Sequence, residues 1–478
     1  MSHPPLSARR NDAVRVALIL DNPKRDLDGL ALVVCQLLRS GVGAMVVPMY
    51  QQGYELPLLA PDVVLVNYAR LNNKDLLATY RAMGSRVAVM DTEGGVLSEH
   101  GADSPANWAR HFRASGFAEL VDSYFFWGEK VREAFLADSG LPADVLRVTG
   151  CPRYDVCAPP WSNALVYPKD GYVLINTNFS SINPIYTRSD EREKRIFKDL
   201  GWEAGYVERL FSDLTAVFPR YLETLARLAH DNPATRFLIR PHPFENPMSY
   251  RERFDGVPNV EINGEGNILP VIAHASLVLH LNCGSAVETN LLGKIPVSLE
   301  FLNTDTMRRH APLPSQISCP AEGYDELCAW VRDPGGCAAR HDPALVMKGH
   351  IAPWFGPIDG RASERLADGL VELARRSMRA PRRSLASSLR GGRSPVAPGR
   401  LAQGVLANLL GTQAMSGLRY VFTPARRGKS VTLADIVARM DRFAAVASIA
   451  LDYTCRHARH PITGLPLTSI ELVPKGAP

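Results

Sequence analysis

The sequence of 478 residues predicts an α/β protein with two parallel sheets, each covered by helices on both faces. Short apolar runs rich in β-branched residues alternate with longer amphipathic segments, which is typical of βαβ units. The alternation begins at residue 14 and begins again after Pro159 and Pro160. At about 150 residues per domain the length allows two or three domains, and a hydrophobic content of 46% can fill their cores.

The first predicted domain covers residues 14–158. Its first strand is the run VRVALIL at 14–20, and the amphipathic segment 26–41 that follows ends at Gly41, a common helix stop. Further strands are expected at 42–49, 62–68, 86–90, 122–128 and 146–150. Together these segments predict a Rossmann-like domain, expected to carry the acceptor and the catalytic group.

The second predicted domain covers residues 165–377, is also Rossmann-like and is expected to bind the nucleotide. It is expected to hold strands at 172–178, 236–243 and 260–264, a strand, turn and helix within 275–300, and a terminal helix at 363–377. Ligands bind beyond the carboxyl ends of the strands in such sheets. The two domains are therefore expected to face a cleft that holds the site.

Residues 378–400 form an expected linker, and residues 401–478 an expected small helical appendage. The stretch 375–400 holds eight arginines and no acidic residue among serines, prolines and glycines, a composition that cannot bury enough apolar surface to order itself. Its charge could also attract an anionic membrane surface. The chain has no apolar run near the roughly 20 residues of a membrane helix, no secretory signal and eight cysteines without a C-x-x-C pair. We therefore expect a cytoplasmic protein, peripheral at the inner membrane if the linker binds lipid.

Two carboxylates, Asp91 and Glu93, follow the predicted strand 86–90 in the motif D-T-E-G-G. Side chains at i and i+2 of a strand point to the same side, so both are expected to face the cleft as candidate catalytic groups. Gly94 and Gly95 are expected to let a substrate approach the backbone. A turn role for Asp91 is the alternative.

The motif R-P-H-P places Arg240 and His242 in a loop at the end of a strand, with prolines on both sides of the histidine. Groups that carry a positive charge or an N–H suit a phosphate or a carboxylate there. Both residues are therefore candidates for nucleotide binding, and a structural histidine is the alternative.

The segment L-N-C-G-S-A-V-E is interpreted as a strand, a tight turn at Gly284 and a helix that opens with Ser285. Ser285 and Glu288 have the spacing of a capping box. The same helix start offers backbone N–H groups to a nucleotide phosphate. Both interpretations stay open, and these three residues are candidates for nucleotide binding.

The polar turn I-N-T-N-F-S-S-I-N at 175–183 follows the first strand of the second predicted domain. Asn176, Asn178 and Ser180 are candidate sugar-binding residues, because they offer hydrogen bonds without charge. Helix capping is the alternative.

Motifs of several other enzyme classes are missing. No G-x-G-x-x-G follows a strand, and the sequence contains neither a Walker A motif nor H-E-x-x-H, which argues against hydride transfer, P-loop hydrolysis and zincin chemistry. The D-x-D match of Asp26 and Asp28 opens the first helix and is explained by the helix dipole. We expect chemistry without a divalent metal and without a cofactor beyond the donor substrate.

Taken together, the motifs resemble those of GT-B glycosyltransferases. The resemblance rests on V-T-G-C-P-R-Y-D (148–155), R-P-H-P, and G-S-x-x-E followed by L-L-G-K-x-P-V. INTNFSSIN, DTEGG and IDGRASERLADGL (358–370) are similar to segments of bacterial capsule and O-antigen proteins, and of CMP-Kdo-dependent transferases among them. The resemblance covers about residues 14–377.

The resemblance implies a transfer of Kdo or a related acidic sugar from a CMP donor to a glycan or lipid-linked glycan acceptor. His242 and Ser285 would hold the CMP phosphate, Glu288 the ribose or cytosine, and Asp91 or Glu93 would act on the acceptor. No nucleic-acid partner is expected. The alternatives are a CDP-glycerol-type polyol-phosphate transferase, a UDP-sugar 2-epimerase and a non-catalytic scaffold of a polysaccharide assembly complex.

Overall fold

The computed structural model describes residues 14–95, 104–185, 190–199, 201–377, 429–461 and 463–475. The chain divides into two compact units. Unit 1 consists of residues 1–92, 115–125 and 363–478, and unit 2 of residues 93–114 and 126–362. The domain limits expected at 158, 165 and 377 stay predictions, and the linker 378–400 lies outside the described residues.

Unit 1 is built on a mostly parallel sheet. Its strands are β1 (Arg15–Leu20), β2 (Gly43–Pro48), β3 (Val63–Val66), β4 (Arg86–Met90), β5 (Ser123–Phe126), β13 (Tyr453–Arg459) and β14 (Pro466–Pro474), and their order is β13-β14-β2-β1-β3-β4-β5. Its helices are α1 (Pro23–Arg39), α2 (Gln52–Leu59), α3 (Lys74–Ala82), α18 (Ala362–Ser377) and α22 (Leu433–Val446). The order β2-β1-β3-β4-β5 is that of a flavodoxin-like, doubly wound sheet.

The start of α1 shows why the chain turns into a helix directly after β1. Asn22 is the N-cap, and its side chain accepts a hydrogen bond of 3.1 Å from the Lys24 N–H. Pro23 occupies the first helical position, where its missing N–H costs nothing. The helix therefore begins earlier than the expected residue 26, and it ends before Gly41, whose φ of +73° suits glycine.

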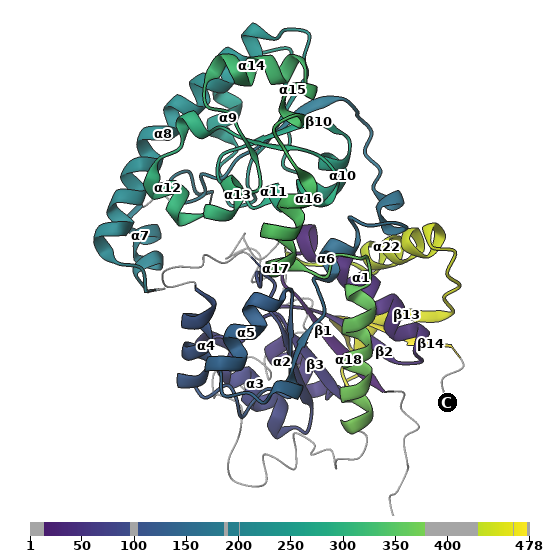
Figure 1. Ribbon diagram of the computed structural model, residues 1–478. Coiled ribbons are helices and arrows are strands. Elements are labelled where there is room, and N and C mark those ends of the chain that lie inside the picture. Colours follow the sequence, from purple (N-terminus) through teal and green to yellow (C-terminus); the bar gives the residue numbers. More distant parts are fainter. Residues whose placement is uncertain are drawn as a thin grey trace, which may run out of the picture. The chain divides into compact units, whose positions relative to one another are not determined.

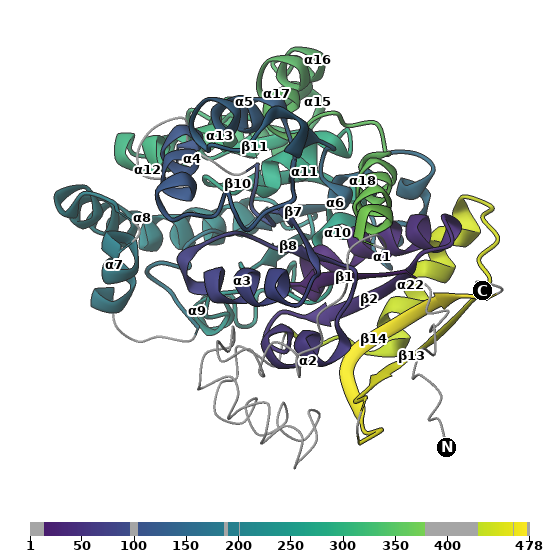
Figure 2. The same cartoon turned by 90° about the horizontal axis from the view of Figure 1, so that it is seen from below.

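The C-terminal residues extend this sheet, which corrects the prediction of a helical appendage. α22 is a helix as expected, but residues 453–474 form the hairpin β13–β14, and β14 pairs antiparallel with β2 (Figure 2). Side chains of β13 alternate in exposure, the period of a half-buried strand. The predicted helix extended over this segment, although its side chains alternate. Residues 401–428 lie outside the described part of the chain.

Unit 2 contains a parallel sheet of six strands. They are β7 (Tyr172–Asn176), β8 (Phe237–Arg240), β9 (Val260–Ile262), β10 (Ala275–His280), β11 (Pro296–Ser298) and β12 (Cys319–Pro320), in the order β12-β11-β10-β7-β8-β9. Unit 2 also contains the short strand β6 (Leu146–Val148). In the six-stranded sheet, β7 lies between β8 and β10. When the strands are numbered from β7 in chain order, their order is the Rossmann order 3-2-1-4-5-6.

Helices cover both faces of the unit 2 sheet (Figure 1). The helices that belong to unit 2 are α4 (Pro105–Ala114), α5 (Glu129–Asp138), α6 (Pro152–Asp155), α7 (Asp190–Asp199), α8 (Ala204–Asp231), α9 (Met248–Arg253), α10 (Ile268–Ala273), α11 (Ser285–Leu291), α12 (Asp305–His310), α13 (Pro312–Gln316), α14 (Tyr324–Arg332), α15 (Gly335–Ala338), α16 (Pro343–Val346) and α17 (Ala352–Phe355). Val173 and Ile175 of β7 pack into one core with α8, whereas Tyr172 and Leu174 pack into a second core with α10. A strand buried on both faces explains why the sequence shows a continuous apolar run there.

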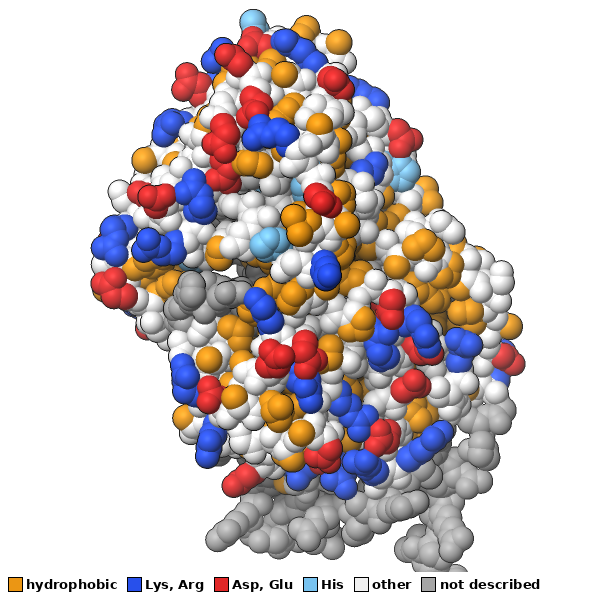
Figure 3. Space-filling model, viewed as in Figure 1, with side chains coloured by type: hydrophobic (Ala, Val, Ile, Leu, Met, Phe, Trp, Pro, Cys, Tyr) orange, Lys and Arg blue, Asp and Glu red, His pale blue; other side chains and the backbone are white. Residues whose placement is uncertain are grey.

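The predicted fold class of two Rossmann-like sheets is therefore confirmed. Among the described helices, none is both long and apolar enough to span a membrane. On the face seen in Figure 3, basic and acidic side chains are interspersed. That face therefore does not have an electrostatic potential of a single sign.

Candidate functional site

The carboxyl edge of the unit 2 sheet has a topological switch point between β7 and β10. The connection from β7 leads to β8 on one side, and β10 lies on the other side. Loops that leave two such strands diverge, and ligands of doubly wound sheets bind in the crevice that results. The residues that follow β7 and β10 are therefore the candidate site.

Two hydrogen bonds join these two loops. Asn176 Nδ2 donates to Ser285 Oγ at 2.9 Å, and Asn178 Nδ2 donates to the Asn282 carbonyl at 2.7 Å. Asn282 has a φ of +51°, and Asn303 holds its side chain by a pair of amide hydrogen bonds. The structure thus brings together the predicted residues Asn176, Asn178 and Ser285, with Gly284 beside them.

One polar atom of Asn176 is a candidate for contact with a ligand. The residue is 2% exposed, and among the described residues its Oδ1 has no hydrogen-bond partner. Such a buried acceptor is costly unless a ligand or a water satisfies it. Ser180, the third predicted sugar-binding residue, lies partly exposed after Phe179 in the same turn.

The capping-box interpretation of Ser285 and Glu288 is wrong. Gly284 is the N-cap of α11 and Ser285 is its first residue, and no side chain caps the helix. Instead, Ser285 Oγ accepts from Asn176 and donates to Cys283 Sγ at 3.1 Å. A Cβ on Gly284 would meet no atom within 4 Å, so open space lies beside the backbone at this turn.

Glu288 belongs to a buried ion pair. Its Oε1 lies 3.7 Å from Arg153 Nη2, and both side chains are 11% exposed. The Arg153 guanidinium lies over the rings of Trp127 and Tyr154, at 5.1 and 4.8 Å from their centroids, and donates to the Tyr154 hydroxyl at 2.8 Å. Arg153 was not among the predicted site residues, and its motif V-T-G-C-P-R-Y-D served only as part of the resemblance to GT-B glycosyltransferases.

His242 is held through its main chain. Its backbone N–H donates to Thr177 Oγ1 at 3.1 Å, and its Nδ1 accepts from the Phe244 N–H at 3.3 Å. An imidazole that accepts at Nδ1 carries its proton on Nε2 when it is neutral. The loop therefore presents an N–H donor beside the turn that follows β7.

Arg240 has other partners than the predicted nucleotide. Its guanidinium donates to the carbonyls of Glu265 and Gly266 at 2.7 and 2.5 Å. Burial lowers the pKa of Arg240. Its observed role is to hold the 265–266 turn, and a contact with phosphate stays a prediction.

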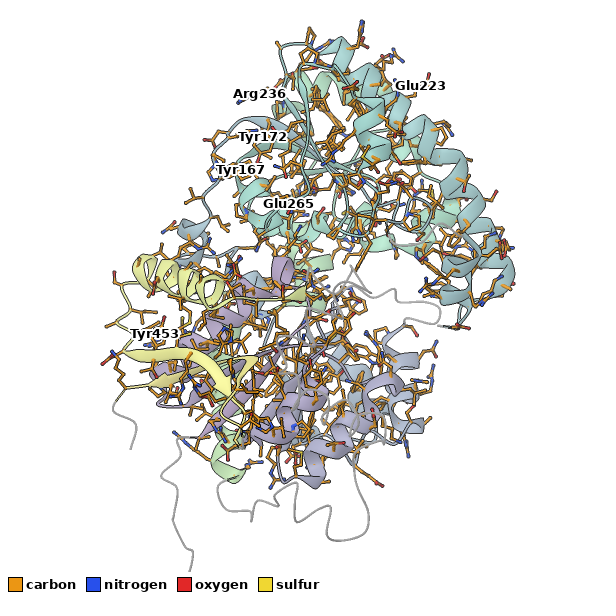
Figure 4. All side chains as sticks on the ribbon, turned by 180° about the vertical axis from the view of Figure 1, so that it is seen from behind. Tyr167, Tyr172, Glu223, Arg236, Glu265 and Tyr453 are labelled. Carbon is orange, nitrogen blue, oxygen red and sulfur yellow. The ribbon has the colours of Figure 1, made fainter. Side chains whose placement is uncertain are left out.

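Two tyrosines lie near Arg240. The rings of Tyr167 and Tyr172, both labelled with Glu265 in Figure 4, meet edge to face at 5.8 Å, and the Tyr172 hydroxyl donates to the Val271 carbonyl. Burial raises the pKa of Tyr172.

Glu245 is a site residue that the sequence analysis missed. It is 1% exposed, and its carboxylate accepts from Thr177 Oγ1 at 2.8 Å, from the Phe179 N–H at 2.7 Å and from the Tyr250 hydroxyl. The partners Thr177 and Phe179 lie 68 and 66 residues earlier in the chain. No local spacing in the sequence can indicate such a contact.

The two predicted catalytic carboxylates lie in different environments. Asp91, at the end of β4 in unit 1, is 2% exposed and lies 3.2 Å from Arg70 Nη2. Arg70 also lies over the Tyr68 ring at 5.0 Å. Glu93 is exposed and belongs to unit 2. Asp91 is thus buried whereas Glu93 is exposed, and the expectation that both face the cleft stays a prediction, as do their catalytic roles.

Gly95 has a packing role in place of the expected role in substrate approach. A Cβ there would lie 2.4 Å from Phe355 Cε1 and 2.5 Å from Trp127 Cε3. Real Cβ atoms do not make such contacts, so these rings require a glycine.

The D-x-D residues serve unit 1. Asp26 lies in the first turn of α1, where an acidic side chain meets the helix dipole. Asp28 is buried and forms ion pairs of 3.0 Å with Arg439 and Arg442 of α22. Among the residues described, no group of three or more histidine, cysteine or acidic side chains could hold a metal ion.

No family model and no curated protein matches the chain by sequence. Among solved structures, the chain is similar to UDP-GlcNAc 2-epimerase of Neisseria meningitidis bound to UDP-GlcNAc, with 15% identity, 75% of this chain and 100% of that chain covered and a TM-score of 0.44. It is similar to S. aureus MnaA with UDP, with 14% identity, coverages of 77% and 99% and a TM-score of 0.46. It is also similar to the wall teichoic acid polymerase TagF, with 11% identity, coverages of 77% and 91% and a TM-score of 0.48.

Proposed function

We propose that unit 2 binds the nucleotide of an activated sugar at the switch point of its sheet, and that the protein transfers this sugar to a glycan acceptor. One observation carries the proposal. A chain of hydrogen bonds and peptide links runs from Ser285 through Asn176 and Thr177 to His242. It places two hydroxyls, a buried amide and an imidazole N–H at the edge where such sheets bind phosphates.

The proposed chemistry follows from the hydrogen-bond donors at this edge of the sheet. A nucleotide leaves as an anion, and donors fixed in advance where that charge develops lower the barrier. The Nε2–H of His242 is such a donor, and the Asn176 Oδ1 atom offers an acceptor for a sugar hydroxyl. None of these groups has to change its protonation state to bind.

The charge balance of the edge favours a nucleoside monophosphate donor. Three arginines of unit 2 have partners within that unit: Arg240 donates to two carbonyls, Arg153 pairs with Glu288, and Arg308 lies 3.1 Å from Glu300. A pyrophosphate carries more negative charge and calls for cations that are aimed at it. An imidazole with neutral amides and hydroxyls suits the single phosphate of a CMP-linked sugar, with an acidic sugar such as Kdo as the specific form.

The acceptor hydroxyl needs a base or, if configuration is retained, the donor needs a nucleophile. We assign this role to Glu93, which is exposed and can contact an acceptor. Asp91 is buried and engaged with Arg70, so its proposed role is to orient that guanidinium. No divalent metal enters this scheme.

Calorimetric titration of the full chain with CMP, CDP, UDP and cytidine tests the proposal. CMP should bind more tightly than cytidine and at least as tightly as the two diphosphates. Mass spectrometry of nucleotide release from CMP-linked acidic sugars then tests the reaction. A preference for CDP would favour polyol-phosphate transfer, a preference for UDP would favour 2-epimerisation, and no response to any nucleotide would favour a scaffold; each outcome would overturn the proposal.

A further inference from the structure

We propose that Glu245 and Thr177 act as positioning residues that hold His242 in place for the nucleotide phosphate. The inference rests on the proposed function of the unit 2 edge. It assigns a role to a buried carboxylate that the proposed reaction does not use.

Glu245 is the centre of a closed set of hydrogen bonds. Its Oε1 accepts from Thr177 Oγ1 and from the Phe179 N–H, and its Oε2 accepts from the Tyr250 hydroxyl. Burial raises the pKa of Glu245, and these donors oppose that rise. Burying the Glu245 carboxylate to 1% exposure costs free energy. This cost indicates a specific role for the group.

The Thr177 hydroxyl transmits the position of this carboxylate to His242. A hydroxyl has one proton, and the proton of Thr177 points to Glu245 at 2.8 Å. The lone pairs of Oγ1 are then left to accept the His242 N–H at 3.1 Å. The charge of Glu245 therefore fixes which way the hydroxyl faces, and with it the hydrogen bond of the histidine.

The two loops around Glu245 are also tied by their backbones. The Asn246 N–H donates to the Asn183 carbonyl at 2.8 Å, and the Ile185 N–H donates to the Phe244 carbonyl at 2.9 Å. Neither bond involves Thr177 or His242. The loops would thus remain paired without Thr177, while the histidine would lose the hydrogen bond between its backbone N–H and Thr177 Oγ1 in the β7 turn.

A matched pair of variants separates positioning from plain stability. Thr177→Val and Tyr250→Phe each remove one buried hydroxyl that donates to Glu245, but only Thr177 contacts His242. We expect the two variants to lose similar thermal stability. Thr177→Val should weaken CMP binding about tenfold and leave cytidine binding unchanged, whereas Tyr250→Phe should change neither more than about twofold.

Calorimetric titration of the full chain with CMP and with cytidine measures this difference. Thr177→Ser should restore CMP affinity, because it keeps the hydroxyl. If Thr177→Val does not fold, Thr177→Ala replaces it, since it also removes the hydroxyl that His242 contacts, and the same loss of CMP affinity is expected.

Equal CMP affinity in Thr177→Val and Tyr250→Phe, or loss of CMP and cytidine binding in equal proportion, would overturn the inference alone. Wild-type protein that binds CMP no better than cytidine would overturn the proposed function and this inference with it.

Discussion

Asn176 Nδ2 donates a hydrogen bond of 2.9 Å to Ser285 Oγ, and so joins the end of β7 to the first residue of α11, 109 residues further along the chain. Both groups are buried. The bond fixes the Asn176 amide so that Oδ1, which lacks a partner among the described residues, is directed away from Ser285. The geometry of the candidate site therefore depends on this contact.

Ser285→Ala should weaken nucleotide binding, because Asn176 loses its anchor and the amide can rotate. The expected loss is about tenfold, the effect of one hydrogen bond within a binding site. Ser276→Ala is the control, since Ser276 lies near the other end of β10 and donates to the Tyr172 carbonyl at 3.0 Å. Titration calorimetry with CMP compares the two. Equal affinities would show that the Asn176–Ser285 bond is merely structural.

Gly284→Ala should fold normally and bind nucleotide more weakly. Gly284 has a φ of −58°, which alanine adopts readily, and the added Cβ meets no protein atom within 4 Å. A methyl group in that space would obstruct a phosphate that approaches the backbone. Gly349→Ala also adds a Cβ into open space in unit 2 and serves as the control. Undiminished CMP binding by Gly284→Ala would place the ligand elsewhere.

The carboxylates should separate in a turnover assay. Glu93→Gln should lower transfer by about 100-fold to 10,000-fold, the usual cost of losing a general base, with CMP affinity preserved. Asp91→Asn should lower it less, because the amide oxygen can still accept from Arg70. Rates of nucleotide release and CMP affinities are measured for both. Near-normal turnover in Glu93→Gln would remove this residue from the mechanism.

Stability of unit 2 should fall above neutral pH because of His274. Its Nδ1 faces Asp170 Oδ1, its Nε2 faces the Leu165 carbonyl at 3.1 Å, and these bonds raise the pKa of His274 in the folded protein. The stabilisation is thus fully present below the unfolded value near 6.5 and is lost as pH rises through the raised folded value. Thermal unfolding midpoints across pH 5.5 to 9 should show this slope.

His274→Gln should flatten that slope, whereas His350→Gln, a change at a partly exposed histidine of the same unit, should retain it. A wild-type midpoint that does not fall with pH more steeply than that of His274→Gln would contradict the assignment.

The strands follow from local patterns, whereas the strand order with its switch point and the partners of the site residues do not. Apolar runs predicted β7 and β10 because both faces of the sheet are buried, and the polar residues after them could be named as candidates. The same reasoning could not show that Arg240 turns to two carbonyls, because its partners lie 25 and 26 residues further on. The S-x-x-E spacing indicated a capping box because spacing ignores where the helix begins.

The C-terminal hairpin illustrates a further limit. Glu55 in α2 is buried and accepts from the backbone N–H groups of Thr468 and Ser469 at 2.9 and 2.8 Å, contacts that span more than 400 residues. Edge pairing of β14 with β2 gives these residues their strand form. Their sequence alone does not indicate the partner strand.

Vesicle binding by the linker is best tested with arginine substitutions in 378–400, because truncation would remove β13 and β14.

The central claim is that the loop at His242 binds a nucleotide phosphate, and CMP affinity in His242→Ala tests it most directly. The residue lies in a partly exposed loop, so the variant should keep the thermal stability of the wild type. Titration calorimetry with CMP and with cytidine should show that the wild type gains affinity from the phosphate and that His242→Ala loses this gain, with cytidine affinity unchanged. An unchanged CMP affinity in His242→Ala would contradict the claim.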